Sequence, residues 1–257
     1  MSIGLLLTTS KKAAISFPEM QTVLVLLLFF TVTPAQAMGK KPFHFVMQPS
    51  GVGRCQDSQG VVGLNPDYVG ECGNAQEKDL SNQDLHGQAL LGIYLFAADL
   101  AGTNLKLTDL TGANLTGANL FNSEMVGAHL RDAVLSGANL NSANLSSADL
   151  TRSKLNSTNL SQALMQGAVL VQADLRSADL SDVDLTEGNL NRAFLVGAEL
   201  NGANLSETDL RGADLSLTNL SQVKLDHSKF DDKTKLPFDR NNAESRGMIF
   251  IPAKDSY

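Results

Sequence analysis

Histidines, cysteines and carboxylates are the side chains of this 257-residue chain that could do acid–base, nucleophilic or metal chemistry. The four histidines, His44, His86, His129 and His227, are scattered, and none is spaced from a cysteine or carboxylate as metal ligands or catalytic partners are. The sequence has no glycine-rich phosphate loop. We therefore expect no enzymatic activity, no bound metal ion and no cofactor.

The two cysteines, Cys55 and Cys72, lie in one short segment that is rich in glycine and turn residues. Such a segment has little core of its own and gains from a covalent constraint, so we predict one disulfide between them. Four oxygen-bearing side chains nearby could in principle ligate calcium: Asp57, Asn65, Asp67 and Glu71. They fit no standard calcium-loop spacing, and turn chemistry explains them more simply.

Leucine returns at every fifth residue from Leu80 to Leu225, is replaced only by Met125 and Met165, and gives way to Phe230. A helix places one face at spacings of three and four and a strand at spacings of two, so a period of five fits neither. The residue two before each leucine is usually small, the residue just before is usually Asp or Asn, and turn-prone residues follow. This pattern predicts a solenoid whose chain turns after each unit and whose leucines fill the axis.

The unit A-(D/N)-L-x-x resembles the repeat of the pentapeptide-repeat family over roughly residues 76–230. The resemblance implies an all-β fold, a right-handed quadrilateral parallel β-helix with four pentapeptides, hence about twenty residues, in each coil. Met125 and Met165 agree with this, because they would then lie on one face two coils apart. Residues 38–75 and 231–257 are expected to cap the two ends of the solenoid.

The N-terminus carries the features of a secretory signal peptide over residues 1–37. Lys11 and Lys12 precede an apolar run over residues 23–32, and Ala35-Gln36-Ala37 forms an Ala-x-Ala cleavage site. The run is too short for an ordinary membrane span, and no other long apolar stretch follows it. The protein is therefore expected to be exported, periplasmic or secreted, with no membrane span after cleavage. An uncleaved anchor is the alternative, and Met20 is an alternative start.

The C-terminal segment contains the apolar run Met248-Ile249-Phe250-Ile251. Residues 231–238 resemble the closing segment that often follows the last repeat in this family. The run could fold back over the last coil or form a dimer contact, as in family members that pair through their C-terminal ends. We favour capping within one chain, and hence a monomer, with a C-terminal homodimer as the alternative.

One predicted outward face departs most from the motif, assuming twenty residues in each coil. Tyr94, Val134 and Phe194 stand just before its leucines, and Phe96 and Val196 stand just after. Exposed aromatic residues on a rigid face often mark partner contacts, so these five are candidate partner-binding residues. The alternative is that isolated surface apolar residues are normal and that Tyr94 and Phe96 pack under the N-terminal cap. Three further apolar residues extend toward adjoining faces: Leu164, Val169 and Val171.

The formal net charge is -7, and acidic residues are concentrated between Asp174 and Asp214. The resemblance matters here, because some family members look like duplex DNA in shape and charge and protect DNA gyrase. The motif itself supplies many of these aspartates, and a signal peptide would separate the protein from cytosolic gyrase. There is no basic patch with interleaved aromatic residues, so direct nucleic-acid binding is not expected. The sequence favours an exported scaffold that binds an unknown protein partner, with a DNA-mimicking inhibitor as the alternative.

Overall fold

A computed structural model describes residues 73–252 of the chain. The predicted signal peptide of residues 1–37, the Cys55–Cys72 disulfide, the calcium candidates and residues 38–72 of the expected N-terminal cap lie outside the described residues. No helix within residues 73–252 has the length and apolar character to cross a membrane.

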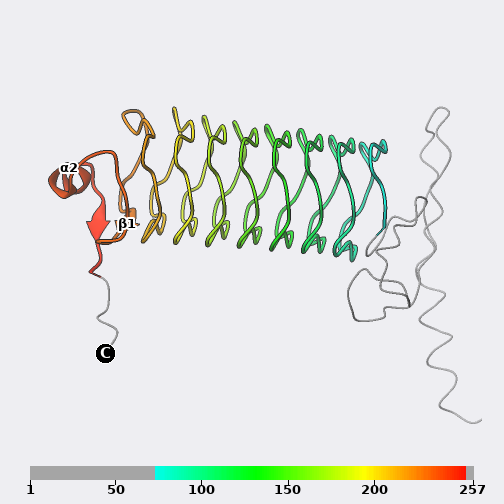
Figure 1. Ribbon diagram of the computed structural model, residues 1–257, viewed down its shortest axis with the longest axis horizontal. Helices are drawn as coiled ribbons and strands as arrows, with labels where there is room; N and C mark the ends of the chain where they lie inside the picture. Colours follow the sequence, from blue (N-terminus) through cyan, green and yellow to red (C-terminus); the bar gives the residue numbers. More distant parts are fainter. Residues whose placement is uncertain (1–72, 253–257) are drawn as a thin grey trace, which may run out of the picture. The chain divides into compact units, whose positions relative to one another are not determined.

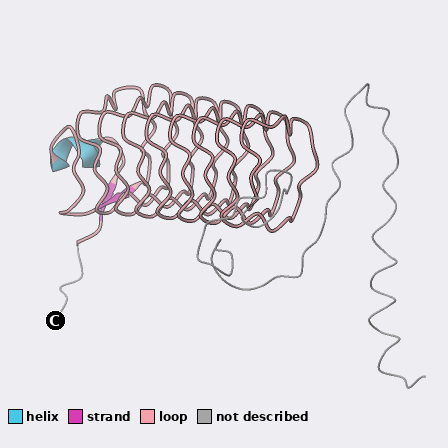
Figure 2. Cartoon of the chain, turned by 45° about the vertical axis from the view of Figure 1, so that its right-hand side comes forward, coloured by secondary structure: helices cyan, strands magenta, loops and turns pink. Residues whose placement is uncertain are grey.

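The described chain winds into a coil whose successive turns pair as parallel strands (Figures 1 and 2). In the regular coils the outward residue before an axial leucine bridges the residue twenty positions on, as Tyr94 does with Asn114. The Leu95 N–H donates to the Asn114 carbonyl at 2.7 Å, and the Asn114 N–H donates to the Ile93 carbonyl at 2.9 Å. Four pentapeptides therefore complete one coil, as the resemblance implied.

The coil has four faces, which we name by the residues that form the bridges. Face A carries Asn74, Tyr94, Asn114, Val134, Lys154, Asp174, Phe194, Asp214 and Lys235. Faces B, C and D follow in chain order, and their columns begin at Asp79, Asp84 and Ala89. Each pentapeptide contributes its bridge residue to a face and its last two residues to the corner that follows.

From Glu77 to Leu217 every corner is a two-residue turn whose second residue has a positive φ. The Ala98 N–H donates to the Leu95 carbonyl at 3.1 Å, and Ala97 between them has a φ of 53°. The sequence suggested glycine, serine, asparagine and aspartate for these turns, yet Leu107 and Leu217 also occupy them, with φ of 55° and 62°. A Cβ disfavours this conformation by roughly 1–2 kcal/mol, so the paired strands on either side impose it.

The core is a stack of leucines and small residues along the axis. Leu115, Leu150 and the other axial leucines between residues 100 and 195 are fully buried, and so are Met125 and Met165 in one column two coils apart. Where threonine replaces the small alanine its hydroxyl is satisfied, since Thr158 donates to the Leu135 carbonyl at 2.8 Å. The interior is thus apolar without any aromatic residue in the regular coils.

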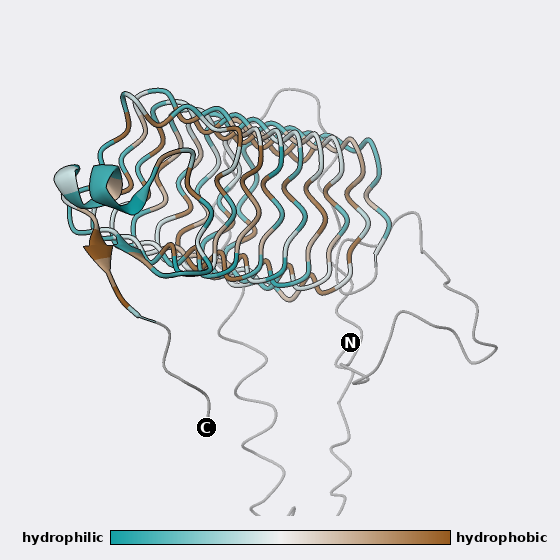
Figure 3. Ribbon diagram, turned by 60° about the vertical axis from the view of Figure 1, so that its left-hand side comes forward, coloured by the Kyte–Doolittle hydropathy of each residue, from teal (hydrophilic) through white to brown (hydrophobic). Residues whose placement is uncertain are grey.

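The regular winding changes after β1 (Lys229–Phe230). Asp214 bridges Lys235 rather than the residue twenty positions on, so one extra residue enters the corner after Phe230. The chain then forms the short helix α2 (Arg240–Ser245) and the strand β2 (Ile249–Phe250), which pairs parallel to β1 with Ile249 opposite Lys229. Figure 3 shows the hydrophilic α2 in teal and the hydrophobic β2 in brown.

The segment from residue 231 to 252 packs on the last coil through few but specific contacts. Ala243 of α2 and Met248 are buried against the core. The Arg246 guanidinium donates to the carbonyl of Leu220 and, at 3.0 Å, to that of Val223. The bond to Val223 satisfies a carbonyl for which the coil supplies no further strand, and the bond to Leu220 adds to the turn bond from the Val223 N–H.

Candidate protein interface on face A

Face A holds all five residues predicted to bind a partner, and the structure divides them into two clusters. Tyr94 and Phe96 stack on each other, with ring centroids 6.3 Å apart and ring planes 15° apart. Phe194 and Val196 lie five coils farther along, at about 24 Å if coils are spaced by the usual strand distance. Val134 stands between them and is half-buried. The expected stripe is therefore two apolar clusters separated by a polar band.

Phe194 is the most exposed of the five, with 49% of its surface accessible. Tyr94, Phe96 and Val196 are half-buried, because side chains of neighbouring coils pack against one another on the flat face. Leu217 joins the second cluster one coil later, at the corner after face A, and is 83% exposed. Leu217 is not among the residues predicted from sequence. The sequence nevertheless marks Leu217 as a departure from the repeat, because it stands two positions after an axial leucine, where the repeat usually has a small or polar residue.

The polar band of face A contains charges of both signs. Arg176 pairs with Asp174 at 2.6 Å, and Lys235 pairs with Asp214 at 2.8 Å. The hydrogen bonds from the Arg176 guanidinium hold the pKa of the Asp174 carboxyl below its ordinary value. Partial burial opposes the same shift at Asp214, but hydrogen bonds from Lys235 and Ser216 lower the pKa of that carboxyl. Lys154 stands next to Asp174 in the column.

The outward charges are segregated around the coil between residues 108 and 217. Faces A and D with their corners balance six acidic residues against six basic ones. The acidic residues are Asp109, Asp132, Asp149, Asp174, Asp209 and Asp214, and the basic residues are Arg131, Arg152, Lys154, Arg176, Arg192 and Arg211. Faces B and C with their corners carry no lysine or arginine in this range and seven acidic residues: Glu124, Asp179, Asp182, Asp184, Glu187, Glu199 and Glu207.

Other exposed apolar residues are dispersed rather than clustered on face A. Leu164 on face C is 44% exposed, whereas Val169 and Val171 on face D are half-buried. Phe121 and Leu107, at the corners on either side of face C, are 46% and 59% exposed.

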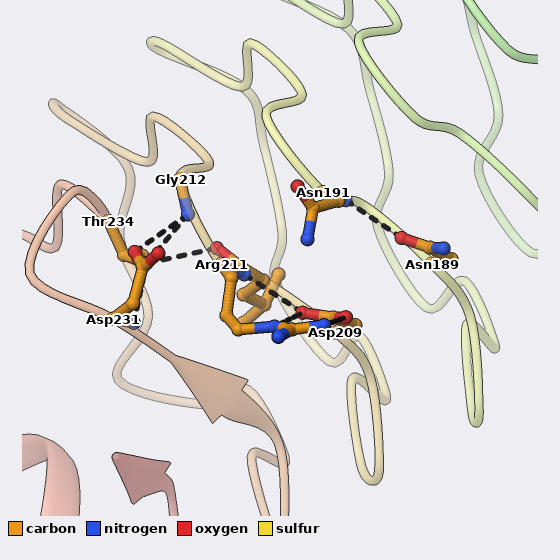
Figure 4. A network of polar contacts seen from close by, with 8 residues as sticks. Asn189, Asn191, Asp209, Arg211, Gly212, Asp231 and Thr234 are labelled. Carbon is orange, nitrogen blue, oxygen red and sulfur yellow. Dashed lines mark hydrogen bonds and ion pairs between the residues drawn. The ribbon is translucent and has the colours of Figure 1, made fainter. Parts of the chain in front are cut away.

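A polar network closes the corner between faces D and A at the last coil (Figure 4). The Asp231 carboxylate accepts the Gly212 N–H and the Thr234 hydroxyl, both at 2.9 Å, and so replaces the carbonyl that a further regular coil would supply. Burial alone would raise the pKa of Asp231, but these hydrogen bonds and those of two further N–H groups lower it. The network closes a backbone edge and holds no reactive group in an enclosed space.

Within residues 73–252 no three His, Cys, Asp or Glu side chains lie close enough together to hold a metal ion.

A cavity of about 410 Å³ lies at the C-terminal end, where Phe230, Phe238 and Phe250 line it with Lys235 and Arg240. Arg240 stacks over the Phe250 ring at 3.6 Å, which accounts for its position there.

Comparison with known proteins gives a consistent result. A model of the family described as pentapeptide repeats (8 copies) matches residues 90–125, 113–152, 153–192, 178–216 and 193–232. A comparison with curated protein sequences gives no match.

Two solved structures are among those similar to the chain. HetL, a pentapeptide repeat protein involved in heterocyst differentiation regulation from the cyanobacterium Nostoc sp. strain PCC 7120, is 35% identical, with 62% of this chain and 72% of HetL covered and a TM-score of 0.47. A trypsin-treated variant of QnrB1, a plasmid-mediated fluoroquinolone resistance protein, is 18% identical, with 69% of this chain and 89% of QnrB1 covered and a TM-score of 0.54. The second likeness shows a common fold.

Proposed function

Because the chain belongs to the pentapeptide-repeat family, whose model covers residues 90–232 of its 257, we propose that it is an exported scaffold that binds a protein partner through face A. The proposal assigns it no catalytic step. The coil supplies a rigid surface, since four of the five backbone N–H groups in each regular pentapeptide are bonded to a neighbouring coil or turn. A partner would therefore bind without ordering the backbone of this surface.

The exposed ring of Phe194 is the observation that carries the proposal. It occupies a position that the repeat fills with Asp or Asn, and its side chain contributes nothing to the axial core, which Leu195 and Ala193 fill on either side. Val196 and Leu217 extend the same apolar cluster. Aromatic residues on a rigid surface are enriched at binding hot spots, so this cluster and the Tyr94–Phe96 pair are the proposed anchors.

The proposal includes a right-handed coil that is closed at both ends. Right-handed connections are strongly favoured between parallel strands. At the C-terminal end, the bonds from Arg246 to the Leu220 and Val223 carbonyls support a role for residues 231–252 as a cap. We propose that residues 38–75, with a Cys55–Cys72 disulfide, cap the other end. Closed ends leave the faces of the coil as the surfaces for binding.

Export is the part of the proposal that can be tested first. Fractionation of the expressing cells and N-terminal sequencing of the recovered protein should give a mature chain that starts at Met38, directly after Ala35-Gln36-Ala37. Recovery of the uncleaved chain from the cytosol would contradict export. Two freely alkylatable thiols in the recovered native protein would contradict the disulfide.

The binding face is tested by photo-crosslinking in the native cell. A photoreactive amino acid is placed at Ser136 or Ser216, which are outward on face A, and in matched controls at Asn141 or Ser181, which are outward on face B. Crosslinked species are expected from face A and not from face B. Phe194→Ala should reduce them, whereas Asn139→Ala, in the column of face B, should not. Equal crosslinking from both faces would contradict the assignment.

A second candidate function rests on the acidic side of the coil. Between residues 108 and 217 faces B and C carry seven acidic residues and no lysine or arginine, and six of the seven lie together between Asp179 and Glu207. Such a surface suits an inhibitor that mimics nucleic acid on a DNA-binding target. A supercoiling assay with purified gyrase and the mature protein tests it. Unaltered supercoiling at a large molar excess of the protein would exclude gyrase as the target.

A further inference from the structure

We propose that the partner bound by face A is a second copy of this chain, in an antiparallel side-by-side dimer. The inference rests on the proposed function, because it names the occupant of the same face. It follows from the order of the outward residues along face A, from the distribution of charge around the coil and from the exposure of Leu217.

The charge of the chain restricts where two copies can meet. With a formal net charge of -7, two copies repel each other unless the contact itself is locally balanced. Faces B and C carry only acidic charges between residues 108 and 217, so two copies would repel strongly there. Faces A and D are balanced in the same range, which leaves them as candidates for self-association.

The residues along face A are complementary to the same residues taken in the reverse order, as an antiparallel second copy would present them. We place a two-fold axis in the interface, midway between Lys154 and Asp174. It makes the coil of the second copy antiparallel and puts each residue of the face A column opposite another residue of the same column. Lys154 then faces Asp174 of the second copy, an attractive pair of charges. The remaining pairs along the column are Val134 with Phe194, Asn114 with Asp214, and Tyr94 with Lys235.

Each of these pairs is chemically favourable and occurs twice in the dimer. Val134 with Phe194 buries apolar surface that the single chain exposes. Asn114 can donate its amide to Asp214, and the stem of Lys235 can pack on the ring of Tyr94 while its ammonium group keeps the ion pair with Asp214. The apolar pairs and the charged pairs therefore alternate along the contact, which also defines its register.

The corner residues after face A fit the same axis. Leu217, which is 83% exposed, comes opposite Gly117 of the second copy. Gly117 has a φ of +65°, and a Cβ built there would meet nothing within 4 Å, so the space beside it is open. Asn156, just after the axial leucine, comes opposite Arg176. The protruding leucine therefore meets no side chain at this position of the second copy.

The same operation fails on the other three faces of the described coil. A central two-fold axis on face B brings Asp99 opposite Asp179 of the second copy. On face C it brings Glu124 opposite Asp184, and on face D it brings Asp109 opposite Asp209. Like charges directly opposite each other oppose association. A parallel arrangement on face A is equally unfavourable, because every charged residue then faces its own copy.

The expected dimer is weak. Seven coil steps separate Tyr94 from Lys235, so the contact is about 34 Å long, and three residues across give a width of about 10 Å. The contact area of roughly 340 Å² on each copy is below that of a standard stable interface. We therefore expect association no tighter than the micromolar range, and weaker association as salt screens the charged pairs.

Charge reversal with mixing tests the dimer and its register together. Sedimentation velocity is measured on the full protein as purified from expressing cells, from about 1 to 500 μM, a range that starts at the tightest association expected. Lys154→Asp and Asp174→Lys should each weaken self-association at least tenfold, because each brings two pairs of like charges together. An equimolar mixture of the two variants should form a one-to-one heterodimer, since every pair is then complementary again. Lys224→Asp, on face C, is the matched control and should dimerise as the unaltered protein does.

Three results would overturn the inference. The protein could stay monomeric over the whole range, it could dimerise equally well with both single variants, as a C-terminal contact would, or the mixture could fail to associate. Circular dichroism melting of each variant shows that it is folded. If the protein is monomeric while Phe194-dependent crosslinks to another protein remain, the inference fails and the proposed function stands. If crosslinks from face A are absent as well, both fail.

Discussion

Face A and face B are built from the same five-residue unit but present opposite surfaces. Behind both, leucines and alanines are fully buried and the same hydrogen bonds join successive coils. In front, face B is an uninterrupted column of Asp, Asn and Glu from Asp79 to Glu199, in which Asn119 donates to Asp99 at 3.0 Å. Face A alternates aromatic, aliphatic and charged residues.

The difference separates the residues that make the coil from those that are free to bind. The fold depends on the inward positions, since these bury the apolar surface, and it tolerates Phe194 and Asp179 equally well at outward positions. A departure from the motif at an outward position therefore carries information about binding. One at an inward position, such as Met125, carries information about packing only.

The largest effect is expected for a change that both faces share. Leu150→Ala removes a fully buried axial side chain and should lower the free energy of unfolding by about 2–5 kcal/mol, because a cavity remains in the core. Denaturant unfolding measures it. Leu217→Ala, at an exposed leucine, is the control and should change stability by less than about 0.5 kcal/mol. An unchanged unfolding midpoint in Leu150→Ala would refute the inward placement of the leucines.

A smaller effect is expected where faces B and C end. Arg246→Ala removes the side-chain donor to the Leu220 and Val223 carbonyls, of which the Leu220 carbonyl keeps the Val223 N–H at 3.2 Å. The variant should destabilise the last coil by about 1–3 kcal/mol. Hydrogen exchange should show faster opening of residues 220–230 than of the central coils. Lys233→Ala, at an exposed residue in the same segment, should leave exchange unchanged. Uniform exchange in the two variants would show that Arg246 does not hold this end.

Acidification should destabilise faces A and D, because it protonates the aspartates that form ion pairs there. The folded-state pKa of Asp174 is lowered by Arg176, so the stability from this pair is present above the unfolded pKa of about 3.9 and is lost as the pH falls through the folded pKa. Since the pair is exposed, Arg176→Ala should lower the melting temperature by only about one or two degrees at pH 7 and by less near pH 2. If the melting temperature of Arg176→Ala fell further below that of the unaltered protein as the pH was lowered, the expected pH dependence would be contradicted.

The smallest effect on stability is expected from making face A resemble face B. Phe194→Asn restores the motif and should leave the free energy of unfolding within about 0.5 kcal/mol of its original value. Binding through face A should nevertheless fall at least tenfold, as measured by sedimentation for the dimer and by crosslinking in the cell. Normal binding by this variant would remove the distinction between the two faces.

Much of the fold follows from the leucine period, and part of the candidate site follows from departures in the repeat. Tyr94, Phe96, Val134, Phe194 and Val196 all lie on one face, as the twenty-residue assumption requires. Their division into two clusters and the part played by Leu217 were not predicted. Corner residues were considered for binding only directly after the axial leucine, as Phe96 and Val196 are, whereas Leu217 is the second residue of its corner. The extra residue after Phe230 was also missed, since one inserted residue leaves no signal once the repeat has ended.

The sequence by itself determined which residues face inward and which face outward, because a period of five with leucine and alanine at fixed positions can bury them in only one way. Only the tertiary structure decided which outward residues are neighbours. Those contacts depend on the number of pentapeptides that close one coil, and that number is set by the backbone geometry of the corners, which no local pattern states. The closeness of Lys154 to Asp174, and the self-complementary order of face A, exist because residues twenty positions apart lie side by side.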